Sequence, residues 1–448
     1  MRRGRLGSLE TLCVCCTAGG LVCLSLGSPA QAATAAPIRV SVATDGRQGN
    51  GNSGSPALSA DGSRIVFASE ATNLVPGDSN ATWDVFVRDL KTGTTRRVSV
   101  GNGGVQGNEH SGVFGPPVID GDARLVAFES GATNLVAGDT NTATDIFVRD
   151  LSGNTTRRIS VSSRGGQANN FSDEPAISAN GRYVAFESAA SNLVAGDSNG
   201  VTDVFVRDLR AGTTRRVSVS GKGLQGNGYS DVPTISADGR YAAFESKASN
   251  LVSGDTNGKT DVFVRDLVAG TTRRISVSTA GKQANNDSSV FATPSISADG
   301  RFVAFESAAS NLVAGDTNKA TDVFVHDLIT GRTTRISVTT SGAQAGGYST
   351  VSGAPVMSAD GRYVAFFSSA SNLATPDTNQ ATDVFVHDMA SGATRRVSVT
   401  GAGAQANAYS DEPALTSDGR VIAFESLAGN LVAGDTNGKD DVFVRRLG

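Results

Sequence analysis

The chain has 448 residues, a formal net charge of −4, 53 glycines and one tryptophan. This length permits a sizeable core, while the nearly balanced charge excludes the concentrated basic face that nucleic-acid binding requires. Abundant glycine between short apolar runs is typical of an all-β protein with many tight turns.

The first 32 residues have the composition of a secretory signal peptide. Three arginines within the first five residues precede an apolar run over residues 12–26, and Ala30 and Ala32 occupy the −3 and −1 positions of a cleavage site. We therefore expect residues 1–32 to be a signal peptide and the mature protein to be exported, either out of the cell or to a periplasm or cell envelope. All four cysteines lie in this segment, so the mature chain would have neither a disulfide nor a thiolate metal site.

The rest of the chain repeats one unit seven times. The motif Asp-Val/Ile-Phe-Val recurs at intervals of 61 or 58 residues, beginning at Asp84, Asp145, Asp203, Asp261, Asp322, Asp383 and Asp441. Each copy holds four short segments rich in β-branched and aromatic residues, separated by turn residues. In the third copy these segments cover residues 175–178, 182–188, 203–209 and 213–219.

Four antiparallel strands repeated seven times predict an all-β fold, a seven-bladed β-propeller over residues 33–448. The last copy ends after its third strand, and residues 37–42 match the missing fourth strand. We therefore expect the N-terminal strand to complete the last blade and close the ring. No later segment reaches the ~20 apolar residues of a membrane helix. We expect a monomeric mature chain without a transmembrane segment.

The repeat resembles a known family. The fragments "SADGRYVAF", "DVFVRDL" and "TTRRVSV" are similar to the TolB-type WD40-like repeat, also called PD40. That motif has Ser-Pro-Asp-Gly, an apolar strand, a strand that begins with Asp and a Thr-rich strand. In this chain alanine replaces the proline, as at residues 236–239. The resemblance implies a propeller fold, an exported location and a binding platform more than a particular reaction.

Strand order places two kinds of connection on opposite sides of the predicted disc. Alternate loops of an up-and-down sheet emerge on the same side, so the short turns share one face and the two longer connections share the other, here called the long-loop face. The outermost strands carry paired arginines such as Arg215 and Arg216. We expect these to face solvent or to pair with acids on the adjacent strand, such as Asp208.

The first long connection carries Asp-x-Asn-x-x-x-Asp in every copy. Carboxylate and amide oxygens at alternating positions suit a hard cation, and Ca2+ would take about 6–8 of them. The other interpretation is structural, because Asp and Asn also bond to nearby backbone N–H groups in turns. The candidate metal ligands are Asp78, Asn80, Asp84, Asp139, Asn141, Asp145, Asp197, Asn199, Asp203, Asp255, Asn257, Asp261, Asp316, Asn318, Asp322, Asp377, Asn379, Asp383, Asp435, Asn437 and Asp441.

The second long connection carries a glutamine in every copy, and several copies add an aromatic residue. Such a rim suits a glycan or peptide ligand, since rings supply contact area and amides supply hydrogen bonds. Alternatively, the glutamine bonds to a neighbouring backbone and the aromatic packs between blades. The candidate ligand-face residues are Gln167, Phe171, Gln225, Tyr229, Gln344, Tyr348, Gln405 and Tyr409.

Little in the chain indicates catalysis. It has three histidines, and two of them, His326 and His387, stand where other copies have arginine. No copy combines the Ser, His and Asp of a triad. The sequence therefore favours a secreted, non-enzymatic propeller that binds a protein or a glycan, with Ca2+ as the one candidate cofactor. The alternative is a secreted polysaccharide hydrolase or lyase that uses acids on the polar face.

Overall fold

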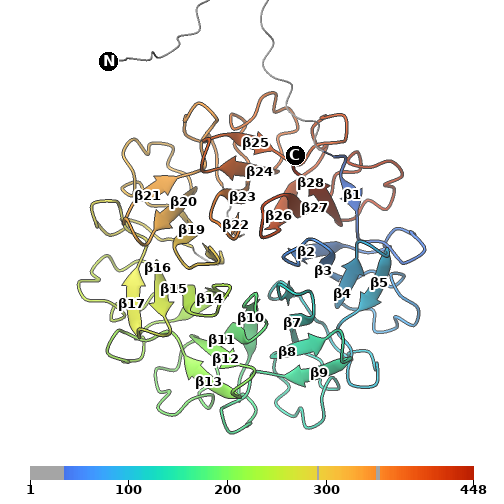
Figure 1. The fold of residues 1–448 in the computed structure, drawn as a ribbon, viewed down its shortest axis with the longest axis horizontal. Coiled ribbons are helices and arrows are strands. Elements are labelled where there is room, and N and C mark those ends of the chain that lie inside the picture. Colours follow the sequence, from blue (N-terminus) through green and yellow to red (C-terminus); the bar gives the residue numbers. More distant parts are fainter. Residues whose placement is uncertain (1–34, 290–291, 350–353) are drawn as a thin grey trace, which may run out of the picture. The chain divides into compact units, whose positions relative to one another are not determined.

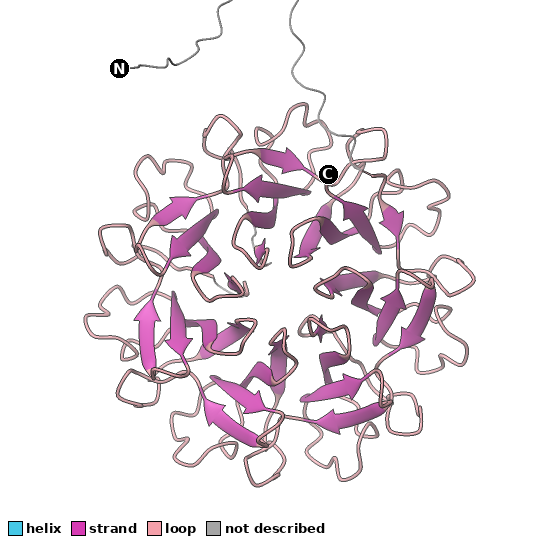
Figure 2. Ribbon diagram, viewed as in Figure 1, coloured by secondary structure: helices cyan, strands magenta, loops and turns pink. Residues whose placement is uncertain are grey.

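The computed structural model describes residues 35–289, 292–349 and 354–448, so the predicted signal peptide lies outside the described residues. Within the described part, seven four-stranded antiparallel sheets stand around a common centre, as Figures 1 and 2 show. Their elements are all strands, and none of the described residues forms a helix able to cross a membrane. The predicted seven-bladed β-propeller is confirmed.

The blades are numbered in chain order, and the strands of each are given from the centre outwards. Blade 1 has β2 (Ser53–Leu58), β3 (Arg64–Ser69), β4 (Asp84–Asp89) and β5 (Thr94–Arg97). Blade 2 has β6 (Val118–Ile119), β7 (Leu125–Ser130), β8 (Asp145–Asp150) and β9 (Thr155–Arg158). Blade 3 has β10 (Ser172–Ile177), β11 (Tyr183–Ser188), β12 (Asp203–Asp208) and β13 (Thr213–Arg216). Blade 4 has β14 (Ser230–Ile235), β15 (Tyr241–Ser246), β16 (Asp261–Asp266) and β17 (Thr271–Arg274).

The remaining blades follow the same order. Blade 5 has β18 (Ser295–Ile296), β19 (Phe302–Ser307), β20 (Asp322–Asp327) and β21 (Thr333–Arg335). Blade 6 has β22 (Val356–Met357), β23 (Tyr363–Ser368), β24 (Asp383–Asp388) and β25 (Thr394–Arg396). Blade 7 has β26 (Ser410–Leu415), β27 (Val421–Ser426), β28 (Asp441–Arg446) and, outermost, β1 (Ile38–Arg39).

The N-terminal strand closes the ring as predicted. Ile38 of β1 pairs with Val444 of β28, and Arg39 pairs with Phe443. Beyond the strand, the Val40 amide donates to the carbonyl of Val442 at 2.8 Å. The last blade is therefore built from both ends of the described chain.

The core lies within and between the blades. The second and third strands of each blade carry cross-strand phenylalanines that stack, such as Phe244 and Phe263 with centroids 6.0 Å apart. Neighbouring blades then pack through aliphatic side chains, as Val66 and Val85 of blade 1 do against Val126 of blade 2. Burial of these alternating apolar residues on both sides of each sheet holds adjacent blades together.

The innermost strands divide the blades into two kinds. In blades 1, 3, 4 and 7 this strand has six residues and a β-bulge, and one bulge residue of each has a positive φ, such as 50° at Glu174. In blades 2, 5 and 6 it has two residues. These three are the blades that follow the 61-residue intervals, so the extra residues shorten the regular innermost strand.

We expect a chain that begins at residue 43 to melt roughly 5 °C or more below a chain that begins at residue 35, because it loses the hydrogen bonds and apolar burial of the closing strand. Its β28 edge should also be free to pair with other copies and form larger species. Thermal unfolding and size-exclusion chromatography measure both effects. Equal melting temperatures and elution volumes would contradict this role of β1.

Candidate functional site

The two long connections of each blade meet on the long-loop face, as the strand order predicts. In blade 1, Nε2 of Gln106, from the connection to the next blade, donates to Oδ1 of Asp78 at 3.0 Å. Asp78 belongs to the connection between the second and third strands. The repeated Asp, Asn and Gln residues therefore form one polar network per blade.

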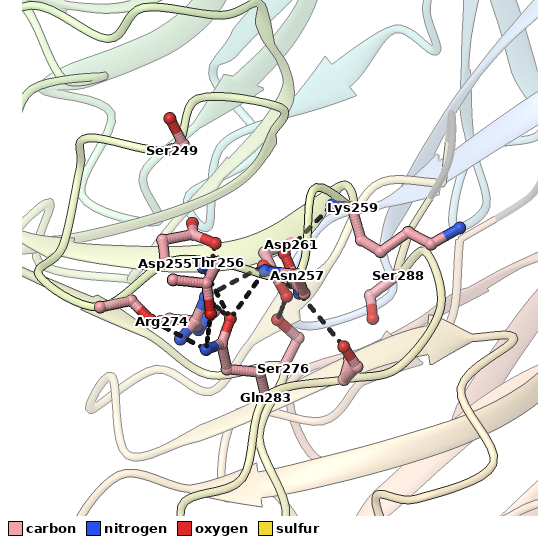
Figure 3. Close-up of polar contacts among 12 residues, drawn as sticks. Ser249, Asp255, Thr256, Asn257, Lys259, Asp261, Arg274, Ser276, Gln283 and Ser288 are labelled. Atoms are coloured by element: carbon pink, nitrogen blue, oxygen red, sulfur yellow. Dashed lines mark hydrogen bonds and ion pairs between the residues drawn. The ribbon is translucent and has the colours of Figure 1, made fainter.

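In blade 4 an arginine of the outermost strand lies between the two aspartates of the network (Figure 3). Nη1 of Arg274 is 2.9 Å from Oδ1 of Asp255 and 3.2 Å from Oδ2 of Asp261. Ser276 Oγ donates to the other oxygen of Asp261, and Asn257 Nδ2 donates to Oδ2 at 2.8 Å. Asp261 is fully buried. The network thus supplies the partners without which a buried carboxylate is costly.

Each blade repeats this pairing of one arginine with two aspartates. The arginine side chains are 7% to 12% exposed, and the second aspartate of each blade is fully buried. The arginines are Arg39, Arg97, Arg158, Arg216, Arg274, Arg335 and Arg396. Because Arg39 comes from β1, the closing strand also completes the network of blade 7.

As expected, one arginine of the β13 pair is exposed and the other pairs with an acid of the adjacent strand, but that acid is Asp203, at the start of β12, and not Asp208. Arg216 bridges Asp197 and Asp203, and only Arg215 is exposed. Asp208 pairs instead with Arg182, at 2.7 Å. Successive residues of a strand point to opposite faces, so one arginine of each pair must point into the blade.

The middle asparagine links the turn to the following connection. In blade 4 the Lys259 amide donates to Oδ1 of Asn257 at 3.0 Å, the bond of an Asx turn. Nδ2 of Asn257 also donates to the carbonyl of Ala284, at 3.1 Å. These bonds join the two long connections through the backbone as well as through the side chains.

The predicted calcium ligands lie in these networks. Burial raises the pKa of Asp261, while Ser276, Asn257 and Arg274 lower it. The space between the two carboxylates holds a guanidinium, which a cation would have to displace. Among the described residues, no group of three or more His, Cys, Asp or Glu is arranged to hold a metal ion. Calcium binding by the 21 candidate residues stays a prediction.

The glutamines predicted for the ligand face belong to the same networks. Nε2 donates to the first aspartate from Gln167, Gln225 and Gln405, at 2.8 to 3.0 Å. In blade 5, Oε1 of Gln344 instead accepts from the Thr317 amide at 3.2 Å. Each of these amides is therefore used within its own blade.

The predicted aromatic residues stand one position before the serine that begins the innermost strand or its isolated bridge. The Tyr229 hydroxyl lies 3.1 Å from Oγ1 of Thr260, and the Tyr409 hydroxyl bonds to Asp440. Tyr348 is 55% exposed, and Phe171 is half-buried. These four residues therefore stand on the long-loop face where an innermost strand or its isolated bridge begins.

A second set of polar residues lies where the innermost strands converge. We call it the central acidic cluster, and it contains Glu129, Asp173, Glu174, Glu187, Asp231 and Glu412. Its members come from blades 2, 3, 4 and 7, whose inner ends surround the centre in Figure 1. The sequence signal was the pair of carboxyls in "SDEP" of blades 3 and 7, which the other copies lack.

Burial raises the pKa values of Glu129, Asp173, Glu174, Glu187 and Asp231. The pKa of Glu187 rises to about 8 through burial and the charge of Asp231, although the Val232 amide, which donates to Glu187 at 2.8 Å, lowers it. Burial raises the pKa of Glu129 to about 7 and that of Asp173 to about 6. Raised carboxyl pKa values such as those of Glu129, Asp173 and Glu187 are a property of acid–base sites and of switchable binding sites.

His326 and His387 contact threonines of the outermost strands and not these acids. Nδ1 of His326 lies 2.9 Å from the Thr333 hydroxyl, and His387 contacts Thr394 in the same way. Arg207 makes the equivalent contact with Thr214. The two histidines thus replace a structural arginine, as the sequence comparison of the copies indicates.

Solved structures share this fold. An oligogalacturonate lyase in complex with manganese matches with a TM-score of 0.54 and 14% identity, over 93% of this chain and 95% of that one. An oligogalacturonate lyase from Vibrio parahaemolyticus matches with a TM-score of 0.51 and 13% identity, over 92% and 93%. TolB from Acinetobacter baumannii matches with a TM-score of 0.41 and 15% identity, over 77% and 62%. No protein-family model and no curated protein matches the chain. At these identities the likeness concerns the fold alone.

Replacing the inward arginine should be far more costly than replacing its outward neighbour. Arg216→Ala leaves Asp197 and the buried Asp203 without their counter-ion, and we expect the free energy of unfolding to fall by about 3 kcal/mol. The matched control Arg215→Ala should change it by less than about 0.5 kcal/mol. Urea unfolding of both variants measures the difference, and equal losses would contradict the structural role of Arg216.

We expect EDTA to leave the melting temperature unchanged, because an arginine already lies between the two aspartates of each blade. Differential scanning calorimetry tests this with about 1 mM CaCl2, which is on the order of the dissociation constants of extracellular calcium modules. The comparison sample contains EDTA at the same ionic strength. MgCl2 serves as the control for charge screening. Stabilisation by calcium alone would contradict the expectation and support the calcium interpretation of the loops.

Proposed function

We propose that the protein is an exported, non-enzymatic binding module of the TolB-like repeat type, and that its ligand, a protein or a glycan, contacts the inner part of the long-loop face. The aromatic rim there carries the proposal. Phe171, Tyr229, Tyr348 and Tyr409 occur in some blades only, whereas the Asp–Arg networks recur in all seven. A feature present in every blade suits a role in the fold, while a feature confined to some blades suits recognition of a ligand.

The networks support this division of roles. Their carboxylates, amides and guanidinium groups are already bonded to one another, as for Gln225, Asp197 and Arg216. A ligand would have to break these bonds to use the same groups. Exposed or half-buried rings, by contrast, bring apolar area and a polar edge without prior rearrangement.

Export follows from the proposed signal peptide. The arginines, the apolar run and the small residues of the first 32 positions support it, together with the absence of cysteine from the rest of the sequence. Outside the cytosol, a chain without disulfides needs another constraint between its ends. The pairing of β1 with β28 supplies that constraint.

A polysaccharide hydrolase or lyase is the second candidate, and the central acidic cluster favours it. Carboxyls with pKa values near neutrality, such as Glu129 and Glu187, are suited to general acid–base work. A concentration of carboxyls would, however, repel a polyuronate unless a cation intervened. Neutral or amino-sugar polymers are therefore the substrates that this alternative would favour.

We expect Tyr229→Ala and Tyr348→Ala to weaken binding about tenfold each, since buried aromatic contacts commonly supply this much affinity. A glycan and peptide array identifies the probe, and calorimetry with the strongest hit measures both variants. Val268→Ala removes an exposed apolar residue from a short turn on the opposite face and serves as the matched control.

The same samples separate the two candidate functions. Release of reducing ends or unsaturated sugars from the bound glycan would favour the enzyme. Affinity that is equal in the wild type, both tyrosine variants and the control would contradict the proposed position of the ligand.

A further inference from the structure

A groove lies between blades 2 and 3 on the face that carries the short turns, opposite the long-loop face. The two blades stand side by side in Figure 1, and the groove, here called the blade 2–3 groove, has a volume of about 760 Å³. This volume lies within the range of small-molecule binding sites. The charged residues that line the groove are Arg124, Asp150, Arg157, Arg182 and Arg210.

The groove between blades 4 and 5, here called the blade 4–5 groove, occupies the same positions of the repeat and provides an internal comparison. Its charged lining residues are three arginines and two aspartates, with a formal charge of +1, whereas four arginines and one aspartate give the blade 2–3 groove +3. Two replacements cause this difference. Asn180 stands where blade 5 has Asp299, and Arg210 stands where blade 5 has Ile329. Both replacements raise the positive charge of the same groove.

A third replacement makes the blade 2–3 groove larger. In the blade 4–5 groove, which has a volume of about 450 Å³, the ring of Tyr241 packs so closely against Gly300 that a Cβ there would lie 2.1 Å from it. The guanidinium of Arg240 lies over this ring, 4.8 Å from its centroid. Leu125 replaces the tyrosine in blade 2, and the side chain of Arg124 is 59% exposed against 43% for Arg240. The blade 2–3 groove therefore offers more space and a more exposed arginine.

Two of the four arginines already have a carboxylate partner. The distance from Nη2 to a carboxylate oxygen is 2.6 Å between Arg124 and Asp150, and 2.7 Å between Arg182 and Asp208. Each pair joins two strands of one blade. These two arginines therefore keep a fixed position at the groove, with part of their charge already neutralised.

The other two arginines, Arg157 and Arg210, have no such partner. Both are exposed, and over the described ranges neither guanidinium forms a hydrogen bond or an ion pair. Arg157 belongs to β9 and Arg210 follows β12, so they line one groove from its two different blades. By contrast, the guanidinium of Arg215, which has the position of Arg157 in blade 3, donates to the carbonyl of Leu267 at 3.0 Å.

We propose that the blade 2–3 groove binds an oxyanion ligand with two or more negative charges, held by Arg157 and Arg210. The ligand carries carboxylate, sulfate or phosphate groups, since the planar guanidinium binds each of these through two parallel N–H groups. Four guanidinium groups in one groove repel one another, and a bound anion relieves this repulsion. The chain as a whole has a net charge of −4, so the attraction is local to the groove. This site is separate from the one proposed on the long-loop face.

Tripolyphosphate is the probe, and isothermal titration calorimetry at low ionic strength is the measurement. We expect Arg157→Ala/Arg210→Ala to weaken binding at least about tenfold, because it removes two charged hydrogen-bond donors. Arg273→Ala is the matched control, since Arg273 has the position of Arg157 in the blade 4–5 groove, and it should bind as the wild type does. Thermal melting verifies that these exposed replacements leave the fold intact.

Two further variants give the blade 2–3 groove the residues of the blade 4–5 groove. Arg210→Ile and Asn180→Asp should each weaken tripolyphosphate binding about two- to fivefold, the effect of one exposed charge. Asn180→Asp retains the size of the side chain and restores the Asp-Gly turn that blades 1, 4, 5, 6 and 7 have, so it tests the charge without a change in the fold.

The source of the oxyanion is distinguished by titrating citrate and a fully sulfated disaccharide beside tripolyphosphate. The anion that binds most tightly identifies the group, and about 0.15 M salt should weaken binding of all three. An equal loss in Arg157→Ala/Arg210→Ala and in Arg273→Ala would overturn the inference, because attraction would then not be specific to this groove. Absence of binding by all three anions would overturn it too. Neither result bears on the long-loop face, which the tyrosine variants test separately.

Discussion

The contact between one guanidinium and two buried carboxylates underlies the architecture of this propeller. In each blade it joins the outermost strand to the connection between the second and third strands, and a serine donates to the second aspartate. In most blades an asparagine or a glutamine bonds to the same carboxylates. The desolvation of Asp203, for example, is offset by Arg216, Ser218 and Asn199 together. Because the same contact recurs seven times, it gives the long-loop face a defined shape in every blade.

This contact also changes the interpretation of the Asp-x-Asn-x-x-x-Asp motif. Alternating Asp and Asn residues are typical of calcium loops, and the composition of the loop alone does not distinguish a metal from a guanidinium. The distinguishing residue, such as Arg274, lies in another strand, thirteen positions after Asp261. An arginine and a serine two positions apart recur in every copy and could have indicated the pairing. The period of two along a strand would then have assigned one arginine to the interior.

The fold could be predicted from the sequence, because it follows from a unit that repeats at regular intervals along the chain. The repeat interval gave the number of blades, and the match between residues 37–42 and the fourth strand gave the closure. The regular repeat does not predict how the blades differ from one another at the centre of the ring. That Glu174 and Glu412 stand in the bulges of β10 and β26, at positive φ, is seen only in the structure. The aromatic rim was visible as a pattern, but the pattern does not predict that Tyr348 is 55% exposed while the Tyr409 hydroxyl bonds to Asp440.

The closing strand affects the order in which the blades can form while the chain is synthesised. The bond from Arg39 to Asp441 joins positions 402 residues apart, whereas the pairings inside blades 1 to 6 are local. A chain synthesised from its N-terminus can build these six blades early, while β1 waits without a partner until the last residues emerge. Contacts of such long sequence separation form slowly. The final closure is therefore expected to set the pace of folding, and its reopening to be the first step by which the finished ring comes apart.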